Sequence, residues 1–210
     1  MIELAKGRLK KFNYKAIQKS FEKLPLDPFI VFSVKNFRSR RFSRLIFDRN
    51  KFKNNSNTIF LQREKNNRLV GGLERKFKPI EENIKKKFQQ VIIDNFNFLI
   101  NNKKIEIGLH QIRITCGKNY VGYPVPEGWH KDGFDFISII NFKSSNIEGG
   151  ITRIRDSITQ NSDSYSCFLH SEEFLFLNDK KFFHYTDPIN VINEKFIGFR
   201  DNLVLTFKCL

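Results

Sequence analysis

Apolar residues recur at helical spacing in two parts of the first hundred residues. Near the start of the chain they stand three or four positions apart, with lysine and glutamine on the other side, at Tyr14, Ile17, Phe21 and Leu24. Pro25 cannot continue a helix, so we expect this helix to end there. Pro79 suits the first position of a longer helix that runs to about residue 100. The lysines at 85–87 would form its solvated face.

The pattern between and after these helices is that of strands. Short apolar runs at 29–34, 44–48 and 58–62 predict strands, and the glycine pair at 71–72 predicts a turn. Beyond residue 104 apolar and polar residues alternate, which is typical of strands with one buried face. The strands predicted in this part are 104–115, 134–142, 151–155, 164–170, 172–178, 181–186 and 201–208. Gly149 and Gly150 predict a turn between two of them.

Many short strands separated by turns favour a sandwich or barrel over alternating strand–helix units. We therefore predict an α+β protein that is mainly β, in which residues 1–210 form a single domain. Residues 1–104 would be a basic, helical or mixed N-terminal part, and residues 105–210 a β core.

The composition adds few constraints. A chain of 210 residues with 40% apolar residues can bury a core. Its apolar runs are shorter than the roughly 18 residues that a membrane helix needs, and its start lacks the apolar stretch of a secretory signal. The three cysteines have neither a metal-binding nor a CxxC spacing. We therefore expect reduced thiols and a cytoplasmic protein without a membrane partner.

The net charge of +15 lies in one half of the chain. Residues 1–110 hold 26 Lys and Arg against 10 Asp and Glu, whereas residues 111–210 hold 11 against 12. A basic surface of this kind could attract nucleic acid or an acidic partner. It could equally reflect a genome rich in lysine and asparagine codons, and no RNA-binding, zinc-finger or helix-turn-helix pattern accompanies it. We favour the second interpretation and do not expect nucleic acid as a partner.

Candidate chemistry gathers around the stretch GYPVPEGWHKDGFDF, residues 122–136. His130 and Asp132 stand two positions apart, so on an extended segment both side chains point to the same side. A third metal ligand would come from another strand, and the candidates are His110, His170 and His184. His184 ends an apolar strand, as His130 precedes one. Two histidines and a carboxylate form the facial triad of non-haem iron oxygenases, which leaves open positions for a co-substrate and dioxygen.

A bidentate anionic co-substrate also needs a cation, and Arg200 lies at the start of the last predicted strand. Simpler interpretations exist for each residue. His130 could be a loop histidine capped by Asp132, His184 a histidine at the edge of the core, and Arg200 the ion-pair partner of Asp201. Their order within a β-rich region favours the metal site.

Several segments resemble the 2-oxoglutarate/Fe(II)-dependent dioxygenase family that includes the bacterial isoleucine and leucine hydroxylases. The segments are HQIRI, GYPVPEGWHKDGFDFISII, NIEGG, FFHYTDPI and GFRDNLVLTF, within residues 105–210, and more loosely GGLERKFKPI before them. The resemblance implies a double-stranded β-helix, or jelly roll. It also implies that His130, Asp132 and His184 bind Fe(II) and that Arg200 binds the 5-carboxylate of 2-oxoglutarate. The expected reaction is hydroxylation of a free, aliphatic L-amino acid by O2, with release of succinate and CO2.

Three further residues are candidates for the substrate site. Gln111 and Arg113 share one face of their strand with Ile105, Ile107 and Leu109. They would be buried polar groups in need of partners if that face pointed inward. A substrate carboxylate or 2-oxoglutarate could be that partner, and so could a structural salt bridge. Glu127 could bind a substrate ammonium group or only anchor its loop.

Other classes of protein remain possible from the sequence. A peptidyl or protein hydroxylase would have the same iron site. A nucleic-acid demethylase of the superfamily would typically carry a second arginine six positions after Arg200, where Thr206 stands. A non-catalytic β-sandwich module would have no reason to keep all four residues of the predicted iron and 2-oxoglutarate sites. A cupin would usually have more than two histidines on its metal.

Overall fold

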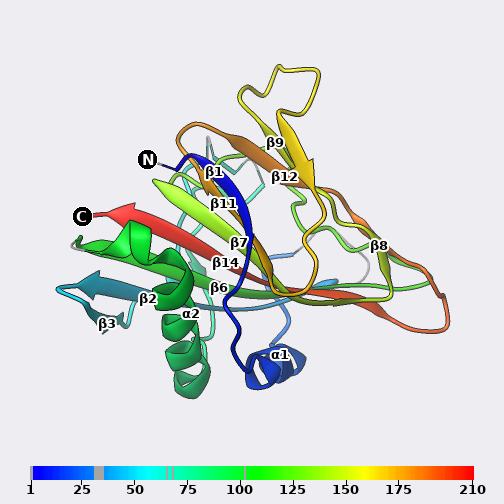
Figure 1. Cartoon of the computed structure of the whole chain (residues 1–210). Coiled ribbons are helices and arrows are strands. Elements are labelled where there is room, and N and C mark those ends of the chain that lie inside the picture. Colours follow the sequence, from blue (N-terminus) through cyan, green and yellow to red (C-terminus); the bar gives the residue numbers. More distant parts are fainter. Residues whose placement is uncertain (1, 31–35, 65, 68, 102) are drawn as a thin grey trace.

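The structure is a computed structural model that describes residues 2–30, 36–64, 66–67, 69–101 and 103–210. It is built around a seven-stranded antiparallel sheet in the spatial order β1-β11-β7-β14-β6-β2-β3. A smaller sheet faces one side of it, and the helices α1 and α2 cover the other side (Figure 1).

The strands of the large sheet come from the whole length of the chain. They are β1 (Leu4–Arg8), β2 (Arg38–Asp48), β3 (Lys51–Asn55), β6 (Ile105–Cys116), β7 (Phe136–Ser145), β11 (Glu173–Asn178) and β14 (Gly198–Cys209). The smaller sheet has the order β10-β9-β12 and contains β9 (Thr152–Arg155), β10 (Tyr165–Cys167) and β12 (Phe183–Thr186). Two further pairs are β4 (Ile59–Phe60) with β5 (Arg75–Lys76), and β8 (Ile147–Gly149) with β13 (Ile189–Val191).

The path of the chain between the two sheets defines a double-stranded β-helix. Beginning at β6, the chain crosses to a segment at His130 that pairs with β12 through an isolated bridge to His184. It returns to the large sheet as β7, crosses to β9 and β10, returns as β11, crosses to β12 and returns as β14. This alternation confirms the jelly-roll prediction.

Apolar side chains form separate layers on the two faces of the large sheet. On one face, α2 (Glu82–Ile100) buries the stripe that the sequence predicted against side chains of β14 such as Leu203 and Leu205. The short helix α1 (Lys15–Ser20) and the turn of 3-10 helix Phe21–Lys23 continue this layer. On the other face, Ile137 and Ile139 of β7 meet Ile154 of β9 between the two sheets.

Several predicted boundaries need correction. The long helix begins at Glu82 and not at Pro79, and β2 begins at Arg38, six residues before the predicted run at 44–48. The run at 58–62 is a strand only at β4. Residues 31–34 of the predicted strand 29–34 lie outside the described residues, and Phe29 and Ile30 are in no strand. The N-terminal half was predicted as a helical or mixed part, yet β1, β2 and β3 belong to the main sheet.

The remaining strand predictions agree with the structure to within a few residues, and the glycines at 71–72 and 149–150 lie in turns or strand ends as expected. The three cysteines are free. No helix among the described residues is long and apolar enough to cross a membrane.

Candidate active site

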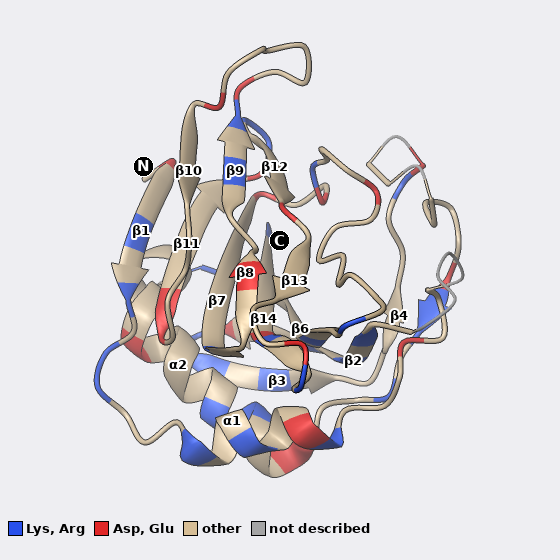
Figure 2. Ribbon diagram, turned by 90° about the vertical axis from the view of Figure 1, so that its right-hand side faces the viewer, with Lys and Arg blue, Asp and Glu red and all other residues tan. Residues whose placement is uncertain are grey.

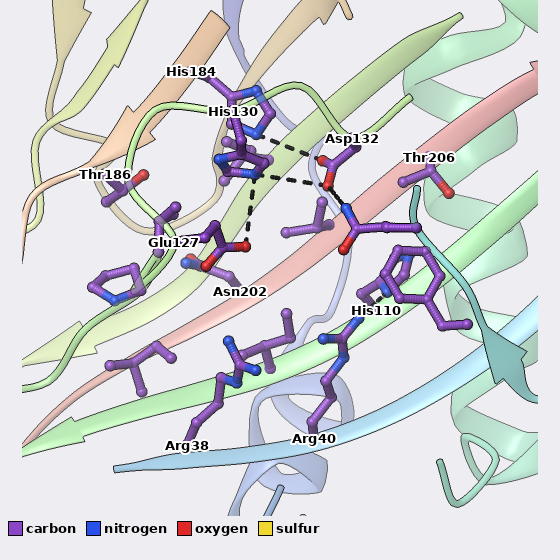
Figure 3. Close-up of a pocket in the computed structure, with 18 of the residues that line it drawn as sticks. Arg38, Arg40, His110, Glu127, His130, Asp132, His184, Thr186, Asn202 and Thr206 are labelled. Atoms are coloured by element: carbon purple, nitrogen blue, oxygen red, sulfur yellow. Dashed lines mark hydrogen bonds and ion pairs between the residues drawn. The ribbon is translucent and has the colours of Figure 1, made fainter. Parts of the chain in front are cut away.

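His130, Asp132 and His184 meet at the open end between the two sheets. The bridge between His130 and His184 brings the imidazole rings to a centroid distance of 4.1 Å. Nε2 of His130 lies 3.7 Å from Oδ1 of Asp132, and Nε2 of His184 lies 3.5 Å from Oδ2 of the same carboxylate. One donor atom from each residue lies within 4.8 Å of the others (Figure 3), so the three could hold a single metal ion.

Neighbouring groups orient these three side chains. Nδ1 of His130 lies 3.0 Å from the carbonyl oxygen of Gly128, so an N–H at Nδ1 donates there and Nε2 keeps its lone pair. The buried carboxylate of Asp179 accepts hydrogen bonds from the backbone N–H groups of Asp132, Gly133 and Phe134, at 2.9, 2.6 and 2.8 Å. The side-chain amide of Gln62 donates to Oδ1 of Asp132 at 2.7 Å. Hydrogen bonds with Gly128, Asp179 and Gln62 therefore position the side chain of His130 and the backbone and carboxylate of Asp132.

The electrostatics of the cluster favour a cation. Burial, followed by the charge of His130, holds the pKa of His184 well below its usual value. Burial, together with the nearby charge of Glu127, raises the pKa of Asp132. A divalent ion would relieve the cost of burying this carboxylate and would bind the neutral imidazole. Two imidazoles and one carboxylate are the donor set of the non-haem iron facial triad, so the residues fit Fe(II).

A cavity of about 100 Å³ opens beside the cluster. Polar and apolar side chains from the large sheet, the loop before His130 and the segment around β4 and β5 line it. Its polar wall contains Arg38, Arg40, Gln62, Arg75, His110, Glu127, Thr186, Asn202 and Thr206. Its apolar wall contains Phe60, Ile112, Ile114, Pro124, Val125, Ile139 and Val204.

Arg200 lies on β14, two residues before the cavity residue Asn202. Its side chain is fully buried, Nη1 donates to the carbonyl oxygen of Gly150, and Nε donates to Oδ1 of Asn202 at 3.3 Å. Nη2 has no hydrogen-bond partner. Burial lowers the pKa of Arg200 to about 10, and no carboxylate among the described residues pairs with it. The alternative interpretation of Arg200, an ion pair with Asp201, does not agree with the structure, because Asp201 points to the other face of the sheet and pairs with Arg113.

Glu127 belongs to the cavity wall, as its expected role at the substrate requires. Its Oε1 accepts a hydrogen bond from the side-chain amide of Asn67 at 3.1 Å and lies 4.0 Å from Nε2 of His130.

Gln111 and Arg113, in contrast, do not reach the cavity. The residues of β6 that line it are His110, Ile112 and Ile114, so the odd-numbered positions point to the opposite face, toward the helices. Gln111 donates to Oγ of Ser20 at 2.7 Å. Arg113 forms a two-pronged salt bridge with Asp201 at 2.6 and 2.7 Å. Neither side chain lies at the cavity, and the salt bridge of Arg113 matches the alternative of a structural role.

The other two histidines are not part of the cluster. His110 lies in the cavity wall, where its ring packs against Phe42 and Phe60 and its Nδ1 accepts a hydrogen bond from Arg40. His170 is exposed and packs against Phe168 near a different depression.

The sequence analysis missed several residues of the site. Arg38 and Arg40 point into the cavity from β2, a stretch that reads as a basic loop in the sequence. Gln62, Asn67 and Arg75 come from the irregular segment around β4 and β5, for which no periodic signal exists. The one usable signal is that Arg38, Arg40 and Phe42 stand two positions apart, so that on a strand their side chains share one face.

A double-stranded β-helix with two histidines and a carboxylate beside a buried cavity defines the class of non-haem metal oxygenases. The sequence model of the 2OG-Fe dioxygenase family matches residues 18–206. The chain therefore belongs to the 2OG-Fe dioxygenase family, which implies Fe(II), 2-oxoglutarate and O2 as its cofactor and co-substrates. A search of curated protein sequences found no match.

Solved structures share the fold at low sequence identity. A bsmA homolog from Methylobium petroleophilum PM1 superimposes with a TM-score of 0.79 at 23% identity, covering 93% of this chain and 80% of its own. IDO from Bacillus thuringiensis gives 0.73 at 21% identity, with 99% and 94% covered. The Fe(II)/α-ketoglutarate-dependent dioxygenase TqaL gives 0.62 at 16% identity, with 95% and 75% covered. These similarities extend over nearly the whole chain.

Proposed function

We propose that the protein is an Fe(II)- and 2-oxoglutarate-dependent hydroxylase of a free, aliphatic L-amino acid or a close derivative. His130, Asp132 and His184 would bind the iron. The observation that carries the proposal is the joint presence, in the same fold, of this cluster and a buried Arg200 that pairs with no carboxylate among the described residues. A family member that had lost its activity would have no reason to bury an uncompensated guanidinium, because an unpaired buried charge is costly.

When bound, iron and 2-oxoglutarate activate O2 so that a hydroxyl group replaces a hydrogen of the substrate, with release of succinate and CO2. The protein's own groups orient the reactants. Arg200 would bind the 5-carboxylate of 2-oxoglutarate through its free Nη2, next to the amide of Asn202. Ile112, Ile139 and Val204 exclude water from the space in front of the cluster.

A small substrate is supported by the size and the chemistry of the cavity. At about 100 Å³ it suits a small molecule better than a folded protein. Glu127 offers a carboxylate for a substrate ammonium group. The resemblance to isoleucine and leucine hydroxylases favours an aliphatic amino acid. Basic residues are spread over separate elements, including α1, α2, β1, β3 and β9 (Figure 2), which favours a small substrate over nucleic acid.

Succinate formation tests the proposal. The protein is loaded with Fe(II) without oxygen, given 2-oxoglutarate and each of the twenty amino acids separately, and then exposed to O2. A strong response to one or two amino acids, with a product heavier by one oxygen atom, is the expected result. A uniform slow background would refute a free amino acid and favour a peptidyl substrate. No oxidation by protein that demonstrably binds iron would refute the enzymatic function.

A further inference from the structure

Two arginines of the cavity wall lie close to the same aromatic ring. The guanidinium carbon of Arg40 lies 5.3 Å from the centroid of the Phe60 ring, and that of Arg75 lies 4.9 Å from it. Arg40 comes from β2 and Arg75 from β5, which are far apart in the sequence. Their exposed fractions are 6% and 2%, so both charges are removed from bulk water.

Neither arginine pairs with a carboxylate among the described residues. Nη2 of Arg40 donates to Nδ1 of His110, and Nη2 of Arg75 donates to Oε1 of Gln62 at 2.6 Å. His110 is neutral, because burial and the neighbouring arginines hold its pKa well below its usual value. The Nε atoms of Arg40 and Arg75 are buried without a hydrogen-bond partner.

Arg38 on the same wall shows the contrasting case. Its Nε donates to Oδ2 of Asp27 at 2.8 Å, and this carboxylate is fully buried, so the charge of Arg38 is compensated within the protein. A structural role would call for the same arrangement at Arg40 and Arg75. Burying two guanidinium groups that pair with no carboxylate costs folding free energy. A bound carboxylate would reduce this cost, because its two oxygens match the planar N–H donors of arginine.

The opposite charge is also present on the wall. Glu127 forms a hydrogen bond with the neutral amide of Asn67, and among the described residues no Lys or Arg pairs with it. The cavity thus offers a pair of cations and a separate anion, which is complementary to a zwitterion. Arg40 is also separate from Arg200, because β6 lies between β2 and β14 in the sheet.

We infer that Arg40 and Arg75 form the carboxylate subsite for the substrate, with Glu127 binding its ammonium group. This inference rests on the proposed function and assigns the ends of the amino acid. Gln62 connects the subsite to the metal centre, because it accepts a hydrogen bond from Arg75 and donates one to Asp132. An α-amino acid held in this way is fixed at its carboxylate and its ammonium group. The polar walls are then occupied, so its side chain points toward the apolar wall and the His130–Asp132–His184 cluster.

The first test separates the substrate from the co-substrate. Arg40→Gln and Arg75→Gln should each raise KM for the responding amino acid about tenfold or more, the range expected when a charged hydrogen bond is lost. KM for 2-oxoglutarate should stay within about twofold, since that ligand uses other groups. Arg41→Gln is the matched control, because Arg41 lies on the same strand but bonds to the carbonyl oxygen of Pro79, outside the cavity. An increase in KM for 2-oxoglutarate instead would overturn the assignment.

The second test needs no turnover. Acetate serves as a carboxylate probe for the metal-free protein, and its effect on the melting temperature is compared with that of chloride at equal ionic strength. The wild type and Arg41→Gln should be stabilised by acetate. The double variant Arg40→Gln/Arg75→Gln should lose a clear part of the effect, and binding at Arg200 accounts for the part that remains. Equal stabilisation of the double variant would refute the subsite. If the double variant fails to fold, the single variants Arg40→Lys and Arg75→Lys replace it. Acetate stabilisation and KM for the amino acid that both stay at the wild-type values in these variants would refute the subsite.

The two tests also separate this inference from the proposed function. If no amino acid is oxidised but acetate stabilisation depends on Arg40 and Arg75, the carboxylate subsite is supported while the proposed reaction fails. If one amino acid is oxidised and its KM is insensitive to both substitutions, the reaction stands and the subsite is refuted.

Discussion

Oδ1 of Asp179 lies 3.9 Å from Nδ1 of His184, on the side of the imidazole ring away from the nitrogen that faces Asp132. The same carboxylate holds the backbone that carries Asp132. Asp179 therefore acts on two of the three proposed metal ligands without facing the ion. Metal-bound histidines usually donate their second N–H to such an acceptor, and a shift of about 0.7 Å would bring the two atoms within hydrogen-bond distance here.

Asp179→Asn should therefore weaken metal binding. The amide keeps one oxygen for the backbone N–H groups but removes the charge that would orient His184. We expect the affinity for Fe(II) or Co(II) to fall about 10- to 100-fold, measured by anaerobic titration. Asp201→Asn is a suitable control, because Asp201 is equally buried but pairs with Arg113 on the other face of the sheet. Equal loss in both variants would indicate a general effect on folding.

Alanine substitution at any of the proposed iron ligands should abolish turnover and leave the protein folded. Each of His130, Asp132 and His184 lies at the edge of the β-helix, where its side chain supports little of the apolar core. Succinate formation and circular dichroism measure the two outcomes. Full activity of His184→Ala would contradict the assignment and turn attention to His110, the other histidine of the cavity.

Arg200→Lys should mainly raise the requirement for 2-oxoglutarate. Lysine keeps the charge but loses the two-pronged geometry, and a charged hydrogen bond contributes about 1.5–3 kcal/mol. KM for 2-oxoglutarate should therefore rise about tenfold or more, with a smaller change in KM for the amino acid. The opposite pattern, with only the amino acid affected, would show that Arg200 belongs to the substrate site.

Arg113→Ala should reduce stability and leave KM for both substrates unchanged. Asp201 is fully buried and would be left without its partner, which costs about 3–5 kcal/mol for pairs of this kind. Denaturant unfolding measures the loss. A raised KM with unchanged stability would restore the substrate role that the sequence suggested.

His110 should make the stability of the metal-free protein depend on pH below 6.5. Burial, with Arg40, Arg75 and Arg44, lowers the pKa of His110 in the folded state, so only the unfolded chain takes up a proton just below 6.5. His110 thus contributes a loss of about 1.4 kcal/mol per pH unit, and His184 behaves in the same way. His110→Asn, which keeps an acceptor for Arg40, should have a shallower dependence in urea unfolding between pH 7 and about 5.5. An unchanged slope would count against a neutral, buried His110.

The sequence predicted the metal cluster well because its signal is local. His130 and Asp132 stand two residues apart in a stretch rich in turn residues, and His184 follows an apolar strand. The need for a cation beside the metal indicated Arg200 at the start of the last strand, and the structure buries this residue without a carboxylate partner among the described residues.

The substrate wall was harder to predict, for a physical reason. Both faces of β6 are buried, one against the helices and one toward the cavity, so alternation identifies the strand but not which face is the inner one. The sequence therefore left open whether Gln111 and Arg113 face the cavity or the helices. Arg40 and Arg75 were missed because buried arginines on a ligand-binding wall look like exposed ones in a sequence.

The position of β14 between β6 and β7 also affects how the protein can fold. β6 and β7 are never paired with each other, and each bonds to a strand that follows them by more than fifty residues along the chain. While the chain is being synthesised, the facing edges of both strands stay open until β14 arrives, and open edges can pair with other chains. Contacts of such long sequence separation slow folding. We expect pulsed hydrogen exchange to show β6, β7 and β14 gaining protection together, so that the large sheet closes in a single late step.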